Sequence, residues 1–314
     1  MAALTEPDEL YTLRNLFWLG SFQAAITEGG RLNRLSDELK VERDEFVYRS
    51  YVGQGQYALV ISEVDDDAAP NLRAVKLLAE YLENPSSTKD QVIDTLGGWL
   101  TGQEKDDSTV QLIASIIYQK EGLQKESFTA LKKQSTMEQI AFWAQMCLQI
   151  NRCDLAEQSL KQMEKDDEDA TLTQLVGAWV NLHKGGAGTK EAAYTYEELI
   201  DKFGGSLTLL NGLAVAKMHQ KDYDEAQKRL QEALALKSND PDALINLISC
   251  SAHMGKEDKE ITRYQSLLYT AHPHHPYVVN MKAKEAEFGK LAAEYLEKEG
   301  LVEDDEGNLV KLEG

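Results

Sequence analysis

The stretch LTLLNGLAVAKMHQKDYDEAQKRLQEALALKSNDPDALINLISCSAHMG, residues 207–255, decides the fold of this chain. Its first part places apolar side chains at helical spacing, at Leu207, Leu210, Leu213 and Met218. A polar turn follows, and then a second amphipathic run begins. The stretch therefore predicts two helices that are joined by a short turn and pack against each other.

The pattern then begins again. Asn239 and Asp240 precede Pro241, which is the sequence of a helix N-terminus with proline in its first turn. Leu244 lies 34 residues beyond Leu210 (244 − 210). Two helices in a 34-residue period, with small residues where the helices must approach closely, are typical of the tetratricopeptide repeat.

Small residues mark the same slot of the second helix along most of the chain. Successive slots are 29 to 36 residues apart. They fall at Ala25, Val60, Val92, Ser127, Ala156, Ala192, Ala226 and Glu260. The signal is strong from Ser115 to Ala233 and weak at both ends, as expected where terminal repeats of a solenoid face water or a partner.

Helical spacing predicts further helices on both sides of the opening stretch. They cover residues 9–19, 22–32, 42–52, 57–64, 72–82, 88–99, 109–119, 125–133, 137–150, 154–163, 172–183, 190–203, 257–271 and 277–299. The helix from residue 88 should start with a capping box, Thr88 to Gln91.

These patterns predict an all-α fold, a tetratricopeptide-like solenoid that forms a right-handed superhelix. The repeats, about eight degenerate helix pairs, should occupy residues 1–271. We expect a C-terminal capping helix over 272–300 and an acidic flexible tail over 301–314. In such an array each repeat should pack only on its neighbours.

The net charge of the chain limits the classes of partner that it can bind. The net charge is −20, so the chain should repel nucleic acid and should not bind an anionic membrane directly. The N-terminus has no basic segment followed by an apolar core, so no signal peptide is predicted. Three cysteines, Cys147, Cys153 and Cys250, suit buried reduced thiols, and the expected location is the cytoplasm.

Several groups of polar residues could suggest a metal or catalytic site. His183, His219 and His253 share one repeat position, but repeats stack about 10 Å apart, too far for one ion to bridge. The tract from His272 to His275 can bind metal or connect two helices, and we favour the connection. The acidic runs lack the spacing of a calcium loop, and no phosphate loop or nucleophile motif occurs. We expect no catalytic residue, no cofactor and no metal site.

Tryptophans suggest where a partner could bind. Trp99 and Trp143 fall on core slots of the repeat, whereas Trp18 and Trp179 fall on slots that face either the inner groove or the core. The first helices of successive repeats should line the concave face, with Trp179 as its anchor. That face is predicted to carry Gln145, Leu148, Gln149, Leu175, Trp179, Leu182, His183, Asn211, Val215, His219 and Ile245.

Some stretches are more specific than the repeat itself requires. They are VERDEFVYRSY at residues 41–51, DEDATLTQL at 167–175 with Ala178-Trp179-Val180, and LLNG at 209–212. On these stretches the sequence resembles the epsilon-subunit family of the coatomer (COPI) vesicle coat, from about Asp8 to Glu294. The segment after Leu301 has no counterpart in that resemblance.

The resemblance implies a function that the repeat pattern alone does not. Members of the family look like adaptors that bind the C-terminal domain of alpha-coatomer, with beta-prime-coatomer in the same subcomplex. It also implies retrograde Golgi-to-ER and intra-Golgi transport, on the cytosolic face of Golgi membrane and COPI vesicles, with membrane contact only through the coat.

Two other function classes remain open. One is a generic co-chaperone-type scaffold that binds a peptide in its concave groove, which would need basic residues there. The other is an enzyme that uses its repeats as a handle, which would need a second domain.

Overall fold

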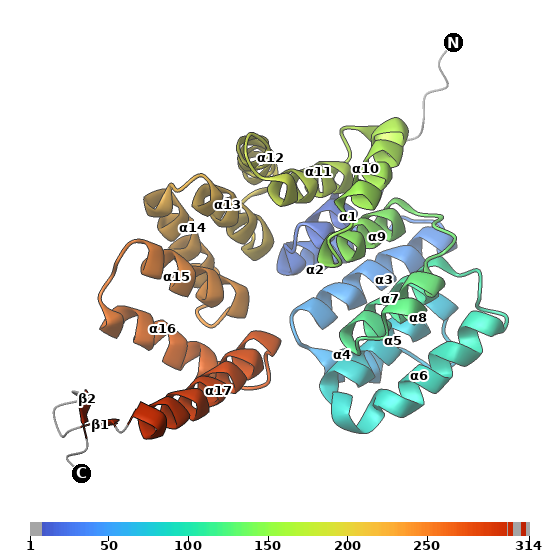
Figure 1. The fold of residues 1–314 in the computed structure, drawn as a ribbon. Coiled ribbons are helices and arrows are strands. Elements are labelled where there is room, and N and C mark those ends of the chain that lie inside the picture. The colour runs from blue at the N-terminus through green and yellow to red at the C-terminus, as the bar shows by residue number, and fades with distance from the viewer. Residues whose placement is uncertain (1–7, 300, 304–308, 312–314) are drawn as a thin grey trace. The chain divides into compact units, whose positions relative to one another are not determined.

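The computed structural model describes residues 8–299, 301–303 and 309–311 (Figure 1). The chain forms two compact units, Met1–Arg229 and Leu230–Gly314. The boundary between them lies inside α14 (Tyr223–Leu236).

The first unit consists of helices in its described part. They are α1 (Tyr11–Trp18), α2 (Phe22–Arg31), α3 (Asp37–Gly53), α4 (Tyr57–Glu63), α5 (Pro70–Glu83), α6 (Pro85–Thr101), α7 (Ser108–Lys120), α8 (Gln124–Ala130), α9 (Met137–Gln149), α10 (Cys153–Asp167), α11 (Thr171–Lys184), α12 (Gly188–Phe203) and α13 (Leu207–His219). Helices that follow each other along the chain pair as α1 with α2, α7 with α8, α9 with α10 and α11 with α12. The starts of α9, α11 and α13 are 34 and 36 residues apart, as the repeat predicts.

The second unit contains α15 (Pro241–His253), α16 (Asp258–Ala271) and α17 (Pro276–Glu299). Val278 at the start of α17 is buried in this unit's core with Leu244 and Leu268. Farther along α17, however, Phe288 is 75% exposed. Only the first turns of the expected capping helix therefore cover apolar side chains of this unit. The apolar pattern of α17 alone could not distinguish a covered face from an open one.

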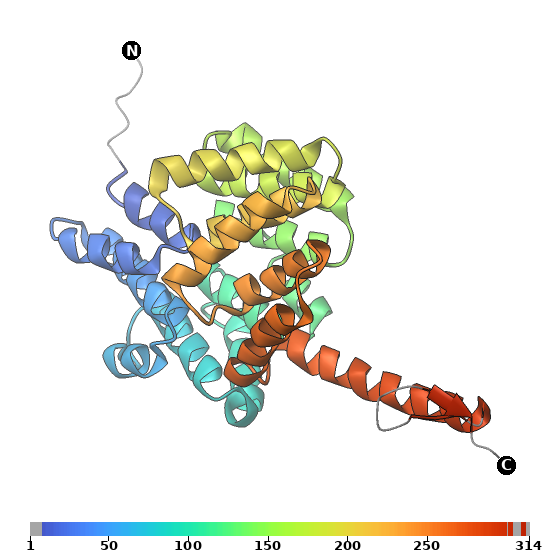
Figure 2. The same cartoon turned by 90° about the vertical axis from the view of Figure 1, so that its left-hand side faces the viewer.

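The segment after α17 differs from a purely flexible tail. Strands β1 (Leu301–Glu303) and β2 (Leu309–Lys311) pair antiparallel, with Val302 opposite Val310 (Figure 2). Val302 and Val310 are β-branched, and such residues favour extended backbone. The rest of 301–314 lies outside the described residues.

Polar side chains begin many of the helices. Asp240 accepts a hydrogen bond from the Ala243 amide at 3.0 Å, which confirms the N-terminus predicted before Pro241. The capping box predicted at Thr88 is wrong, because α6 already begins at Pro85. The Thr88 hydroxyl donates instead to the Asn84 carbonyl oxygen at 2.8 Å, as a threonine inside the first turns does.

The turn between the two helices of a repeat has the same hydrogen bond in several repeats. In each, a backbone N–H donates to a carbonyl oxygen five residues earlier, at 2.8 to 3.1 Å, which closes the last helical turn. The donors are Ser21, Gln56, Leu123, Arg152, Asp222 and Lys256. The residue before the donor lies in the left-handed region, as at Gly20 with φ 77° and Lys221 with φ 65°. The repeat is therefore visible in the backbone as well as in the sequence.

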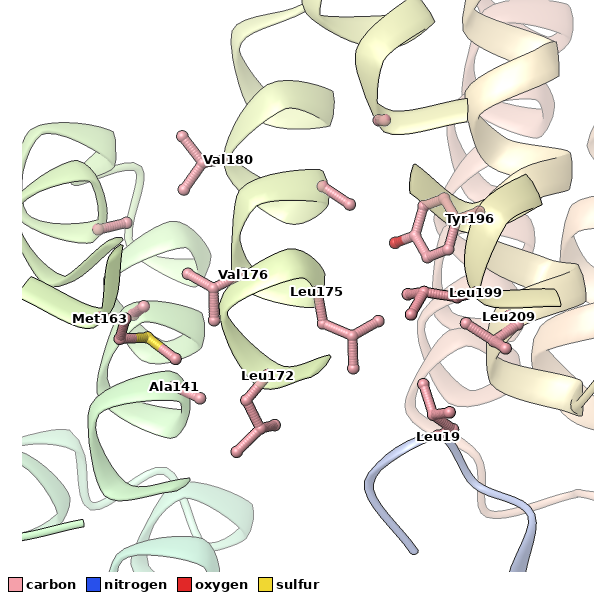
Figure 3. Close-up of a cluster of buried hydrophobic side chains, with 14 of the residues drawn as sticks. Leu19, Ala141, Met163, Leu172, Leu175, Val176, Val180, Tyr196, Leu199 and Leu209 are labelled. Atoms are coloured by element: carbon pink, nitrogen blue, oxygen red, sulfur yellow. The ribbon is translucent and has the colours of Figure 1, made fainter. Parts of the chain in front are cut away.

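The main apolar core of the first unit lies among α9, α10, α11, α12 and α13 (Figure 3). Val176 and Met163 face each other on one side of α11, and Leu175 lies on the side toward Leu199 and Tyr196. Ala144, Ala178 and Ala192 are buried in the same core. Their small side chains let consecutive helices approach closely, as the sequence pattern predicts.

The expectation that each repeat packs only on its neighbours is wrong for the N-terminal helices. Leu19, in the turn after α1, is fully buried in the core of α9–α13, beside Leu209 (Figure 3). The Ser206 hydroxyl donates to the Leu19 carbonyl oxygen, and α1 also contacts α11. Contacts between helices so far apart in sequence leave no periodic signal, so sequence spacing could not predict them.

A buried ionic cluster makes a second long-range connection. Arg49 on α3 pairs with Glu138 on α9 and, at 3.2 Å, with Glu45. Glu45 also accepts hydrogen bonds from Asn71 at 2.8 Å and Thr109 at 2.9 Å. The cluster therefore joins α3, α5, α7 and α9 through one guanidinium and two carboxylates.

Candidate functional site

The residues predicted to face a partner lie on the first helices of consecutive repeats. Gln145, Leu148 and Gln149 are on α9, and the next groups are on α11 and α13. Because α9 packs directly on α11, and α12 links α11 to α13, these three helices belong to one rigid core. Ile245 is on α15 in the second unit, where it lies half-buried against the core around Leu244.

The predicted residues divide by exposure. Gln145, Gln149, His183 and His219 are exposed. The half-buried ones are Leu148, Trp179, Leu182, Asn211, Val215 and Ile245. Leu175 is the exception, since it is 1% exposed and lies inside the core. Its assignment to the partner surface is corrected, because it lies in the buried cluster that also contains Leu19 from the turn after α1. We call the exposed and half-buried members on α9, α11 and α13 the first-helix surface.

The side chain of Trp179 is held in place by the core on which it packs. This buried core contains Tyr196 of α12. Burial raises the pKa of Tyr196, which is 2% exposed, so its hydroxyl stays neutral. Gly212 on α13 makes room for this ring, because a Cβ there would lie 2.4 Å from the ring carbon Cζ. The half-buried Trp179 is therefore a fixed aromatic group with one side toward solvent.

The first-helix surface carries little unpaired charge. Gln149 accepts a hydrogen bond from Gln119 on α7 at 2.5 Å. The lysines nearby are neutralised: Lys217 pairs with Glu197 at 2.8 Å and Lys184 with Glu157 at 3.0 Å. Neutral polar groups around half-buried apolar ones are the composition of a protein-binding surface and not of an anion clamp.

The histidines occupy the positions that the repeat predicts. His183, His219 and His253 lie in the last turns of α11, α13 and α15, where a cation interacts favourably with the helix dipole. The His272 ring contacts the Asn239 carbonyl oxygen at 2.5 Å, so this part of the His-rich tract ties together two connections of the second unit. Within the described part of the chain, no group of three or more metal-ligating side chains comes together.

Two features of the first unit were missed by the sequence reasoning. One is a cavity of about 480 Å³ beside Arg14, Trp18 and Glu42, next to the ionic cluster. The other, of about 750 Å³, lies between α6, α7 and α8. The first cavity could have been inferred from Glu45 and Arg49, two charged residues on a helix whose other residues align with core positions. The second could have been inferred from the lysines near residues 125–133.

None of the helices described is long and apolar enough to cross a membrane.

Comparison with known proteins covers nearly the whole chain. A family model described as "Coatomer epsilon subunit" matches residues 6–296. "Coatomer subunit epsilon-1" of Arabidopsis thaliana is 40% identical over 289 residues, which are 92% of this chain and 97% of that protein. "Coatomer subunit epsilon" of Caenorhabditis elegans is 33% identical over 288 residues, which are 91% of this chain and 98% of that protein.

A solved structure supports the fold. The crystal structure of the APC/C hetero-tetramer Cut9–Hcn1 aligns with a TM-score of 0.59 at 15% identity, and the match covers 90% of this chain and 57% of that one. At this identity the likeness concerns the fold alone, an all-α solenoid of the tetratricopeptide type. Because the family model and the relatives extend over the repeats that form the first-helix surface, the chain belongs to the coatomer epsilon subunit family.

Proposed function

We propose that this chain is an adaptor subunit of the COPI vesicle coat that binds the C-terminal domain of alpha-coatomer, with beta-prime-coatomer in the same subcomplex. It works in retrograde Golgi-to-ER and intra-Golgi transport, on the cytosolic face of Golgi membrane and COPI vesicles. Membership of the coatomer epsilon subunit family supports the coat assignment. Its net charge of −20 supports membrane contact only through other subunits.

The first-helix surface is the proposed binding site, and Trp179 is the observation that carries it. A half-buried aromatic side chain that packs against the core around Tyr196 offers a preorganised apolar contact. Large, rigid aromatic residues supply much of the binding energy in protein interfaces. His219 and Gln145, both exposed, would form the polar rim around it.

The alternative, a scaffold that grips an acidic C-terminal peptide, has less support. Such recognition uses unpaired lysine or arginine side chains at the first-helix positions. Here the nearby Lys184 and Lys217 are both neutralised by glutamates. The proposed role is structural, and it uses no catalytic group.

The test measures complex formation by the purified full-length chain. It is titrated with the C-terminal domain of alpha-coatomer and, separately, with an acidic C-terminal peptide of the type that co-chaperones bind. We expect a complex with the domain in gel filtration and a higher melting temperature, because a ligand that binds only the folded chain stabilises it. The absence of a complex with the domain would overturn the proposal, whether or not the peptide binds.

A further inference from the structure

The cavity between α6, α7 and α8 has a charge opposite to that of the chain. Its lining includes four lysines and only two carboxylates, those of Asp106 and Glu126. The lysines are Lys105, Lys125, Lys132 and Lys133. The chain as a whole has 53 acidic and 33 basic residues, so this is a local reversal of charge.

The four lysines are also exposed and available. In the described part of the chain none of them takes part in an ion pair, whereas Lys76 and Lys89, on the neighbouring helices α5 and α6, each bind a carboxylate. Four like charges around one opening repel each other unless an anion lies between them. Their arrangement therefore favours an anionic occupant.

The floor of the cavity is apolar. Leu100 of α6, Tyr118 of α7 and Ala130 of α8 line it, and Tyr118 is 6% exposed. Burial and then the nearby Glu126 carboxylate raise the pKa of Tyr118, so its hydroxyl remains a neutral donor. An inorganic anion or a sugar-phosphate headgroup would leave these apolar atoms uncovered, whereas a peptide side chain would cover them.

The wall of the cavity is held by two hydrogen bonds of the Gln111 side chain. Gln111 donates to the Lys105 carbonyl oxygen at 2.7 Å, and it accepts from the fully buried Gln139 at 2.9 Å. These bonds hold the connection between α6 and α7 at the rim. The cavity is thus a preformed part of the first unit, so a ligand would not need to order it first.

We propose that this cavity binds an acidic peptide segment of a partner protein, with carboxylates on the lysines and one aromatic or aliphatic side chain on the Leu100–Tyr118 floor. The segment is a second attachment point, on helices other than those of the first-helix surface. The inference does not rest on the proposed coat function. An anionic membrane is the competing occupant, but the net charge of −20 opposes the approach of such a surface to the whole molecule.

Two neighbouring glycines of α6 provide a matched test. A Cβ added at Gly97 or at Gly98 would meet nothing within 4 Å, so a side chain at either position begins in open space. Leucine is also a better helix former than glycine, so both variants should fold. Only Gly97 lines the cavity. Gly97→Leu should therefore fill the cavity, and Gly98→Leu should leave it open.

The experiment uses fluorescein-labelled pentapeptides with the sequences DEWED and NQWQN, with binding to the full-length chain followed by fluorescence anisotropy. We expect DEWED to bind at least about tenfold more tightly than NQWQN, and its binding to weaken with salt. Gly97→Leu and the double variant Lys132→Glu/Lys133→Glu should each lose about tenfold or more in affinity, while Gly98→Leu should bind like the wild type.

Three results would overturn the proposal. The first is no binding of DEWED to the wild type, and the second is equal binding to Gly97→Leu and wild type. The third is lysine-dependent sedimentation with phosphatidylserine–phosphatidylcholine vesicles without peptide binding, which would assign the cavity to lipid. Circular dichroism melting of each variant excludes unfolding as the cause of a loss.

Discussion

Two contacts within the first unit hold helices together by different means. Around α11, consecutive helices meet through small and apolar residues such as Ala178, Ala192 and Leu175. Between α3 and α9, the contact depends on Arg49 and two carboxylates, and Arg49 is only 7% exposed. The first contact repeats along the chain, so it is visible in the sequence; the second joins residues 89 apart and is not.

The largest expected effect comes from breaking the ionic contact. Arg49→Ala leaves Glu45 and Glu138 without their partner, and Glu45 is itself 6% exposed. Removing one member of a buried ion pair destabilises a protein by about 3–5 kcal/mol. Urea unfolding of the variant should show this loss, and a change below about 1 kcal/mol would mean that the cluster is solvated and weak.

A companion variant sharpens this prediction. Burial raises the pKa of Glu45, and the Arg49 charge opposes this rise. The ionised form of Glu45 is therefore the group that is most destabilised when the guanidinium is removed. Arg49→Met combined with Glu45→Gln removes both buried charges. It should recover much of the lost stability, since apolar replacement of a buried pair is often close to neutral.

The next effect tests the apolar contact. Gly212→Ala places a Cβ against the ring of Tyr196, which is 2% exposed and cannot move aside easily. Overpacking of this kind costs about 1–3 kcal/mol. The control is Gly98→Ala, which meets nothing and should stabilise its helix by up to about 1 kcal/mol. Equal melting temperatures for the two variants would contradict the packing assigned to α12 and α13.

The smallest expected effect is a loss of folding stability at acid pH. It involves Glu121, which takes part in neither contact. Lys89 and then the Tyr81 hydroxyl, at 2.5 Å, hold the pKa of Glu121 below its ordinary 4.5. Because the folded pKa is lowered, the stabilisation is fully present above the unfolded pKa and is lost as pH falls through the folded one. The wild type should therefore lose slightly more stability than Glu121→Gln between about pH 5 and about pH 3. Parallel urea unfolding curves at both pH values measure the difference.

Sequence spacing predicts the local structure of this chain well and its long-range contacts poorly. Most predicted helices agree with the structure within a few residues because amphipathic periodicity and caps such as Asp240 act locally. The contacts of Leu19 with Ser206 and of Arg49 with Glu138 depend on how strongly the helical array curves. That curvature adds up many small packing angles between helices, so no single residue in the sequence reveals it.

The candidate surface shows the same limit. The repeat register placed His219 and Gln145 at the surface correctly, but it also placed Leu175 there, although this residue is buried. Leu175 and Trp179 lie one turn apart on the same helix face, and repeat register does not show which part of that face a distant segment such as Leu19 covers. The cavity between α6 and α8 has no counterpart in the repeat pattern at all, since its lysines lie partly in connections.

The most direct test of the account is isothermal titration of the C-terminal domain of alpha-coatomer into the double variant Gln145→Arg/His219→Glu. Both residues are exposed, so the substitutions should leave the melting temperature of the free chain unchanged. We expect the double variant to bind the domain more weakly by about tenfold or more, because both rim positions would carry charges at a surface that is neutral in the wild type. Wild-type affinity in this folded variant would contradict the assignment of the first-helix surface and move the site elsewhere, for example to the exposed apolar side of α17 around Phe288.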